Sequence, residues 1–273
     1  MFPFRDGLRR LPVGGGARRF AGVSVIGSAL IVLVLQVLKV AGILPPGTWT
    51  APFPSGTALI TNERAYTQPL AIGVPRSNVW LVTSGSLFSR DHAGWTGPID
   101  GDRPDPRSKR HTGSAVFRAV TRRQDFRNVT IDFDLKIVRM TTTPRTGAHA
   151  YDGVHVFLRY RNPQSLYAVS VDRRDHLAAV KIKRPGGPSN GGEYTTLGTA
   201  HVMLPPGQWV HEKVRIANER GRVRITLWTA GRQVLSVLSD GSGASAPLLG
   251  AGRVGLRGDN TEFLFRNFTV SPA

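Results

Sequence analysis

Two segments of the chain alternate aliphatic side chains with charged or aromatic ones, and this alternation indicates a candidate binding face. Aliphatic residues occupy every second position of residues 154–158 and of residues 180–182. Because successive side chains of a β-strand point to opposite faces of a sheet, the remaining positions of each segment share one face. The residues predicted for this face are His155, Phe157, Arg159, Lys181 and Lys183. If the two strands are neighbours, their charges form a positive groove suited to an acidic polymer.

Aromatic rings that face solvent can stack on sugar rings, so they are candidate ligand contacts. Trp95 and Tyr194 belong to two polar segments, residues 89–113 and 184–194, that are too long for simple turns. Long loops on a rigid scaffold often carry binding sites. Trp228 alternates away from the aliphatic positions of its strand and is expected on a surface. We therefore add Trp95, Tyr194 and Trp228 to the predicted ligand-binding residues.

Two enzymatic interpretations remain open. A glycosidase needs two carboxylates facing each other across the scissile bond. Asp132 and Asp134 share one face of a strand, but Lys136 beside them fits a solvated outer face equally well. A polysaccharide lyase would use a cation to neutralise a uronate and His or Tyr to move protons, for which His155 and Arg159 are candidates. Neither set of residues is complete, so we predict binding without catalytic residues and keep hydrolysis and elimination as alternatives.

Metal ligation has weak support in the sequence. Asp100, Asp102 and Asp105 offer oxygen ligands at short spacing, but the central glycine and later glutamate of an EF-hand loop are missing. The seven histidines lack the paired spacing of zinc sites. We expect no cofactor and no metal, with calcium at these aspartates as the alternative.

Composition bounds the class of protein. The formal net charge is +18, yet most of the basic residues are arginines scattered along the chain, so nucleic acid is not an expected partner. The 31 glycines and 19 prolines suit many short strands joined by turns. There is no cysteine, so the domain must be held together by its core and not by disulfides.

The N-terminal part has the pattern of a membrane anchor. Residues 1–19 are basic and are expected in the cytoplasm, and residues 20–44 are predicted to form a transmembrane signal-anchor helix. The uncharged residues 20–38 would span about 28 Å as a helix, close to the thickness of a bilayer core. The remainder would face outward from a single-pass cell-membrane protein, or would be secreted if the segment is a cleaved signal peptide.

The rest of the chain divides into a proline-rich stalk with a possible edge strand, residues 45–75, and one folded domain, residues 76–273. The clearest strands are predicted at residues 129–138, 154–160, 166–172, 177–183, 209–217, 223–229, 232–238, 253–257 and 262–270. Residues 257–259 are interpreted as a tight turn. Short strands at regular spacing predict an all-β antiparallel sandwich or jelly roll.

A series of motifs resembles the concanavalin A-like lectin and glucanase superfamily, in particular its laminin G-like and 3-keto-disaccharide-hydrolase-type branch in bacterial exported proteins. In order along the chain they are Trp80 with residues 84–88, DGVHVFLRY from Asp152, Gly207-Gln208-Trp209, a hairpin at Gly231, GRVGLRGDN from Gly252 and RNFTV from Arg266. Trp80 and Trp209 are expected in the core. The resemblance covers roughly residues 76–271 and implies a jelly roll of two antiparallel sheets that binds sugars in many members.

The sequence therefore predicts a membrane-anchored, extracytoplasmic, lectin-like domain that binds carbohydrate without catalysis, with an acidic polysaccharide as the candidate ligand. A lyase or glycoside hydrolase is the first alternative. A structural or protein-interaction module without a glycan ligand is the second.

Overall fold

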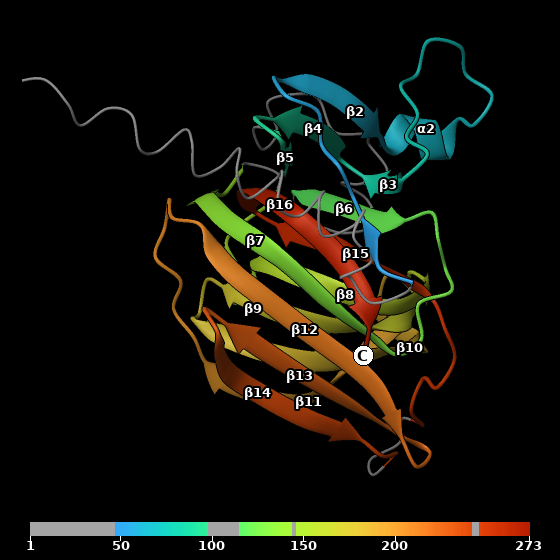
Figure 1. Cartoon of the computed structure of the whole chain (residues 1–273), viewed down its shortest axis with the longest axis vertical. Helices are drawn as coiled ribbons and strands as arrows, with labels where there is room; N and C mark the ends of the chain where they lie inside the picture. Colours follow the sequence, from blue (N-terminus) through green and yellow to red (C-terminus); the bar gives the residue numbers. More distant parts are fainter. Residues whose placement is uncertain (1–46, 98–114, 144–145, 242–245) are drawn as a thin grey trace, which may run out of the picture. The chain divides into compact units, whose positions relative to one another are not determined.

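A computed structural model describes residues 47–97, 115–143, 146–241 and 246–273. These residues form two antiparallel β-sheets and one short helix, α2 (Glu63–Thr67) (Figure 1). The predicted transmembrane helix at residues 20–44, the basic residues 1–19 and the aspartates at 100, 102 and 105 lie outside the described residues. Within the described ranges, no helix has the length and apolar character needed to cross a membrane.

We call the larger sheet, of nine strands, sheet A. Its order is β14 (Arg232–Ser239), β13 (Arg222–Thr229), β12 (Val210–Glu219), β7 (Val129–Met140), β16 (Thr261–Pro272), β5 (Ala93–Trp95), β4 (Ser86–Arg90) and β2 (Ala58–Asn62), with β1 (Trp49–Thr50) also paired to β16. In the middle of this order the neighbouring strands are far apart in the sequence: β12 pairs with β7, and β7 pairs with β16.

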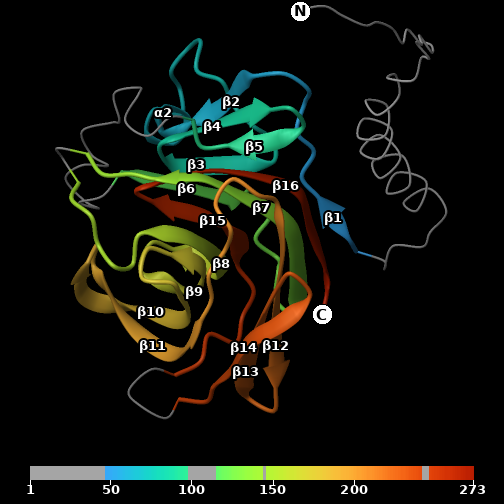
Figure 2. The same cartoon turned by 90° about the vertical axis from the view of Figure 1, so that its left-hand side faces the viewer.

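Sheet B has seven strands. Its order is β11 (Gly192–His201), β10 (Leu177–Ser189), β9 (Ser165–Arg173), β8 (Gly153–Asn162), β15 (Arg253–Asp259), β6 (Val116–Thr121) and β3 (Trp80–Ser84). The strands β8 to β11 curl across from β12, β13 and β14 of sheet A (Figure 2). At one edge of the sandwich, β11 lies against β14.

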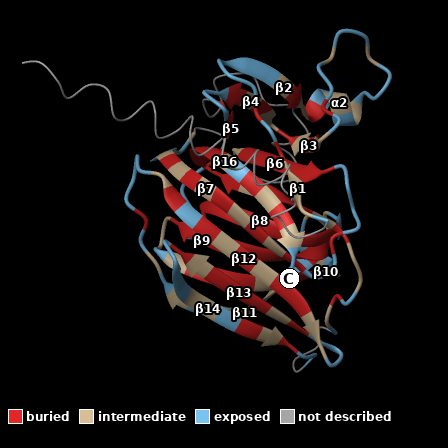
Figure 3. Cartoon of the chain, in the orientation of Figure 1, coloured by how far each residue is buried: buried red, intermediate tan, exposed pale blue. Residues whose placement is uncertain are grey.

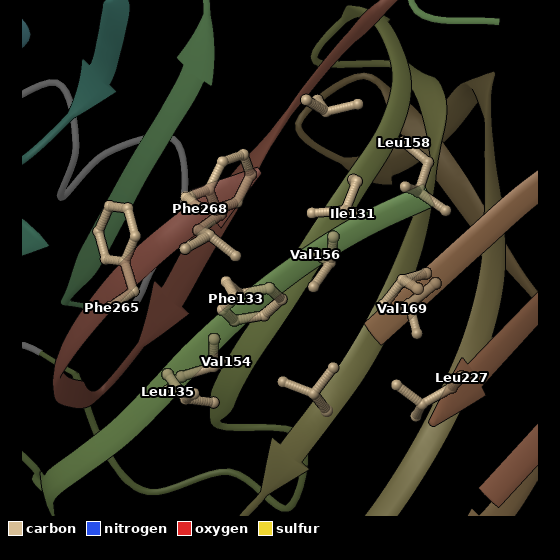
Figure 4. Packing of buried hydrophobic residues seen from close by; sticks show 14 of the residues in the cluster. Ile131, Phe133, Leu135, Val154, Val156, Leu158, Val169, Leu227, Phe265 and Phe268 are labelled. Atoms are coloured by element: carbon tan, nitrogen blue, oxygen red, sulfur yellow. The ribbon is translucent and has the colours of Figure 1, made fainter. Parts of the chain in front are cut away.

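The core fills the space between the two sheets. In β7, residues 129–137 alternate strictly between buried and half-buried positions, as expected for a strand with one face in the core. Figure 3 shows this alternation as stripes along the strands of sheet A. Phe133 and Leu135 from sheet A meet Val156 and Val169 from sheet B, with Phe268 beside them (Figure 4). Each such side chain contributes roughly 1.5–3 kcal/mol by leaving water.

The predicted strands from residue 129 to residue 270 are confirmed, and the all-β sandwich is the observed architecture. One predicted loop is wrong. Residues 184–194 continue β10 to Ser189 and begin β11 at Gly192, so they form the end of a β-hairpin. Glycines and prolines suggested a loop there, but residues near the end of a hairpin tolerate bulges and unpaired positions.

The proposed stalk also differs from the structure. Residues 49–67 contain β1, β2 and α2, and β2 pairs with β4 as an edge strand of the kind that the sequence suggested. Phe53 is buried and its ring lies 6.3 Å from that of Trp80, while the ring of Trp49 lies 5.9 Å from that of Phe126. These aromatic contacts tie the segment to the core, so the folded domain begins well before residue 76.

Two acidic side chains lie inside the sandwich. Glu212 on β12 is fully buried, and it accepts a hydrogen bond from Thr229 Oγ1 at 2.8 Å. Its Oε1 atom has no hydrogen-bond partner among the described residues. Burial raises the pKa of Glu212 to about 9, with a smaller contribution from Asp172 of the opposite sheet. Burial likewise raises the pKa of Asp172 to about 6. Asp172 faces inward because Val171 beside it is an unpaired bulge residue between β9 and β8.

We expect the Glu212→Gln variant to be more stable than the wild type at neutral pH, by on the order of 2–4 kcal/mol. The pKa of Glu212 is higher in the folded state than in the unfolded state, where it is near its ordinary value of 4.5. The folded state therefore retains a proton that the unfolded state has lost, and wild-type stability should fall as the pH rises from about 4.5 to about 9. Urea unfolding at a series of pH values measures this slope.

The matched control is Glu193→Gln, because Glu193 is exposed on β11. This variant should follow the wild-type curve at every pH. Equal stability of wild type and Glu212→Gln across pH 5–9 would show that Glu212 is not held neutral in the core.

Candidate functional site

The outer face of sheet B, which points away from the core, gathers four cationic side chains from three strands. Arg257 on β15 pairs with Arg118 on β6, and Lys181 and Lys183 lie two residues apart on β10. The charge of Arg257 is near enough to lower the pKa values of Arg118 and Lys183, and the charge of Arg118 also lowers the pKa of Lys183. We call Arg118, Arg257, Lys181 and Lys183 the cationic cluster.

A hydrogen-bonded chain of polar groups crosses the same face. His155 on β8 is opposite Arg257 on β15 and opposite Ser170 on β9. Its Nδ1 atom lies 2.8 Å from Ser170 Oγ, and its Nε2 atom lies 3.2 Å from Asp259 Oδ2. Arg257 Nε donates to both Asp259 oxygens, at 2.9 and 2.7 Å. Ser170 and Asp259 are each 2% exposed, so the chain is largely shielded from water.

The electrostatics of this chain define its protonation states. Burial alone would favour the neutral form of Asp259, but the charge of Arg257 and the hydrogen bond from His155 hold the pKa of Asp259 well below its ordinary value. Burial lowers the pKa of His155, and the Asp259 carboxylate offsets this effect only in part. At neutral pH, Asp259 is therefore a carboxylate and His155 is a neutral imidazole.

Three members of the cationic cluster have no hydrogen-bond or ion-pair partner in the part of the chain that the structure describes: Arg118, Lys181 and Lys183. Lys183 lies under the ring of Tyr194, with its Nζ atom 4.9 Å from the ring centroid. Burial, together with the charges of Arg257 and Arg118, lowers the pKa of Lys183 to about 8. Burial also lowers the pKa values of Arg118 and Lys181. These shifts arise mainly from removal of the side chains from water, which disfavours their charged forms.

Aromatic rings surround the cluster. Phe157 and Tyr160 stack with their rings 5.7 Å apart, and both are buried on this outer face together with Leu166. Burial raises the pKa of Tyr160 to about 12. Tyr151 stacks on His149 at 5.0 Å and is 40% exposed, close enough to Asp259 and Arg257 to interact electrostatically with both. Tyr151 is thus an exposed ring beside the charged chain.

Several predicted site residues do lie on one face. His155, Phe157, Lys181 and Lys183 share the outer face of sheet B, and Tyr194 joins them through its pairing with Lys183. The predicted exposure is wrong for part of this set, because His155, Phe157 and Lys183 are all buried.

The prediction for Arg159 is wrong. Its backbone has φ 47°, in the left-handed region, and the pairing of β8 with β9 shifts register just after Leu158. This bulge turns the Arg159 side chain away from the face that carries His155. Arg159 is fully buried, where its Nε donates to the Arg127 carbonyl at 2.9 Å, and its other nitrogens reach the Leu248 carbonyl and Asn128 Oδ1. Burial lowers its pKa to about 10. Arg159 therefore holds two connecting segments to β8.

Trp95 and Trp228 belong to sheet A and do not join the cluster on sheet B. Trp95 on β5 donates from Nε1 to Glu262 Oε1 at 3.0 Å, with Arg90 lying 4.9 Å from its ring centroid. Trp228 on β13 pairs with Lys213 on β12, on the half-buried side of that strand.

The two carboxylates that the glycosidase alternative needs, Asp132 and Asp134, lie on the outer face of sheet A, where both form ion pairs. Asp132 lies 3.2 Å from Lys213 Nζ, and Asp134 lies 3.2 Å from Arg266 Nε, while His211 contacts both carboxylates. Each carboxylate therefore has a cationic partner at an exposed or half-exposed position. Trp209 was expected in the core, and this prediction is wrong. The residue is half-buried, with Arg266 Cζ 4.2 Å from the centroid of its ring. In the described ranges there is no group of three or more metal-ligating side chains.

Arg118, Ser170, Tyr151, Arg257 and Asp259 were not predicted from the sequence. Arg118 lies in β6, whose six residues are all buried, so no alternation marks it. Arg257 and Asp259 end β15 instead of forming a turn. A signal for them was present, because Val254 and Leu256 alternate with positions 255, 257 and 259.

Comparison with known proteins adds solved structures of low similarity. No protein-family model matches this sequence, and neither does any curated protein. The carbohydrate-binding module CBM66 from Bacillus subtilis is 14% identical, with 70% of this chain and 95% of that chain covered and a TM-score of 0.46. Lectin UEA-II complexed with galactose is 9% identical, with coverage of 83% and 98% and a TM-score of 0.45. Winged bean acidic lectin complexed with methyl-α-D-galactose is 11% identical, with coverage of 82% and 97% and a TM-score of 0.46.

The all-β sandwich is established by the two antiparallel sheets and their strand order.

The corrected position of Arg159 gives a stability prediction. The Arg159→Met variant should lose about 2–4 kcal/mol, because the carbonyls of Arg127 and Leu248 would be left buried without their donor. Urea unfolding measures this loss. Arg161→Met is the control and should change stability by less than about 0.5 kcal/mol, since Arg161 is exposed on the same strand. A fully stable Arg159→Met protein would contradict the structural role.

Proposed function

We propose that this protein binds an acidic glycan on the outer face of sheet B. The observation that carries the proposal is the cationic cluster, in which Arg118, Lys181 and Lys183 have no ion-pair or hydrogen-bond partner among the described residues, and in which Lys183 lies against the ring of Tyr194. Buried cations are costly unless a counter-charge is supplied. A carboxylate or sulfate on a bound sugar would supply it.

The geometry suits a uronate better than a small inorganic ion. The planar guanidinium of Arg118 can donate two parallel hydrogen bonds to a carboxylate, and the ammonium of Lys183 can add a third. Tyr194 lies over Lys183, and Tyr151 stands near Arg257, so each supplies an aromatic face close to a cation. A sugar ring that stacks on one of these tyrosines would place its carboxylate among the cations.

We further infer that residues 20–44 anchor the domain to a cell membrane and that the domain faces outward. The support is the sequence pattern of a long apolar segment after a basic N-terminus. The Lys and Arg excess of the chain would not by itself choose a glycan over other polyanions. For that reason DNA serves as a competing ligand in the measurements of polymer retention.

The first experiment measures retention of a uronate-containing polymer by the full chain and by the variants Lys183→Gln and Arg118→Gln. Each substitution removes a charge-assisted hydrogen bond, so each variant should bind the polymer about 10- to 100-fold more weakly. Lys213→Gln is the matched control, because Lys213 is an ion-paired cation on the outer face of sheet A. It should bind as the wild type does.

Salt and pH sharpen this experiment. Binding at the cluster should discriminate among glycans at physiological ionic strength, whereas scattered surface arginines would bind every polyanion, DNA included, and lose it with added salt. Retention should also weaken as the pH rises through about 8, because Lys183 then loses its charge, and Lys183→Gln should not show this dependence. Equal loss in Lys213→Gln and Lys183→Gln would contradict the proposed site.

The recovered polymer should keep its glycosidic bonds. New ultraviolet absorbance from an unsaturated uronate would instead indicate a lyase, and new reducing ends would indicate a glycosidase.

The membrane proposal is tested by the mature N-terminus. The intact chain should fractionate with membranes and lose its β-domain to external protease. Intact-mass measurement should find residues 20–44 still attached. A mature protein that begins near residue 43 would show that the segment is a cleaved signal peptide and that the domain is secreted.

A further inference from the structure

We propose that the outer face of sheet B also hydrolyses acyl esters carried by a bound glycan, with Ser170 as the nucleophile, His155 as the general base and Asp259 as the residue that orients His155. The inference rests on the proposed function for its substrate, an acidic glycan esterified on its hydroxyl groups. It needs no cleavage of the glycan chain.

Three neighbouring strands place the three side chains in contact. Ser170 on β9 is opposite His155 on β8, and Asp259 on β15 lies diagonally from His155. The distances are 2.8 Å from Ser170 Oγ to His155 Nδ1 and 3.2 Å from His155 Nε2 to Asp259 Oδ2. Both lie in the range expected between a nucleophile, its base and the group that orients the base.

The protonation states favour this direction of proton transfer. Asp259 is ionised, so it accepts the hydrogen of His155 Nε2, and the free electron pair of the neutral imidazole is then on Nδ1. Nδ1 therefore accepts the hydroxyl hydrogen of Ser170. Arg257 is a positioning residue, because its Nε bonds both oxygens of Asp259 and fixes the carboxylate against His155.

Lys181 can stabilise the negative charge that develops on the ester oxygen. It is opposite Ala168, two residues from Ser170 along β9, so its side chain is on the same face. Its charge reaches His155, and it has no ion-pair or hydrogen-bond partner in the described ranges. Ser170 pairs with β8 on one side and with β10 on the other. A side-chain cation beside the nucleophile can stabilise this charge as backbone donors do in other hydrolases.

The reaction balances with water as the second substrate. Ser170 Oγ forms a bond to the ester carbonyl carbon while its proton moves to His155 Nδ1 and the carbonyl π electrons move to oxygen. The tetrahedral intermediate collapses, the bond to the sugar oxygen breaks, and that oxygen takes the proton from Nδ1. Water then attacks the acyl-serine with the same base and releases a carboxylic acid and free Ser170.

A fluorophosphonate probe on the full chain tests the nucleophile, because it forms a covalent adduct with an activated serine. Peptide mass spectrometry should find the adduct on Ser170 of the wild type, and His155→Gln should slow labelling by about 100-fold or more. Since Ser170 is 2% exposed, labelling reports access and reactivity together. Ser236 is the internal control, because it is exposed and hydrogen-bonded to Thr226 without any histidine. An absent adduct, or equal labelling of Ser236, would overturn the inference.

Release of acetate from an acetylated uronate polymer tests the activity. The wild type and Ser236→Ala should release acetate at equal rates, and Ser170→Ala should be at least about 100-fold slower. Ser170→Ala should still retain the deacetylated polymer, because the cationic cluster is intact. Retention without acetate release by the wild type would overturn the esterase inference and leave glycan binding standing. Lys183→Gln should lose retention and still be labelled at Ser170, because Lys183 binds the glycan and takes no part in activating the serine. No retention by any form would contradict the proposed glycan binding.

Discussion

The ion pair between Arg257 and Asp259 organises the outer face of sheet B. Both residues are on β15, with strands on either side, and the Asp259 carboxylate is 2% exposed. A buried ion pair adds little net stability, since desolvation offsets most of the attraction, but it fixes the geometry of what contacts it. Here it keeps Asp259 ionised, and this orients His155 toward Ser170. Because Arg257 is paired with the Asp259 carboxylate, that carboxylate does not pair with Arg118, Lys181 or Lys183. The charges of these three side chains therefore remain available to a ligand.

The two outer faces of the sandwich differ in how their charges are balanced. On sheet A, Asp132 and Asp134 form ion pairs with Lys213, Arg266 and His211 at positions that water reaches. Such pairs contribute little to stability, and their charges need no further partner. On sheet B, Arg118 and Lys183 are buried, Lys181 and Arg257 are half-buried, and these cations outnumber the carboxylates around them. Charge on the first face is satisfied within the protein, whereas Arg118, Lys181 and Lys183 on the second face have no ion-pair partner among the described residues. This contrast is the physical reason for placing the ligand on sheet B.

The sequence predicted the parts of this arrangement that follow from local periodicity. Long alternating segments revealed the strands from β7 onward, and they placed His155, Phe157, Lys181 and Lys183 on one face. Arg159 and Asp172 were beyond such reasoning, because a bulge inserts one residue and reverses every face that follows it until the register recovers. Arg118 was also hidden, because β6 is buried on both faces and shows no alternation. That Trp95 and Trp228 belong to the other sheet from His155 also could not be predicted, because sheet membership depends on pairings between distant segments.

The most direct test of glycan binding at the cationic cluster is a crystal structure of the protein with a uronate oligosaccharide. We predict that the sugar lies on the outer face of sheet B, with a carboxylate within hydrogen-bonding distance of Arg118 and Lys183 and with Tyr194 or Tyr151 against a sugar ring. A sugar bound on the outer face of sheet A, or one on sheet B whose carboxylate points away from these cations into solvent, would show that the cationic cluster is not the glycan-binding site.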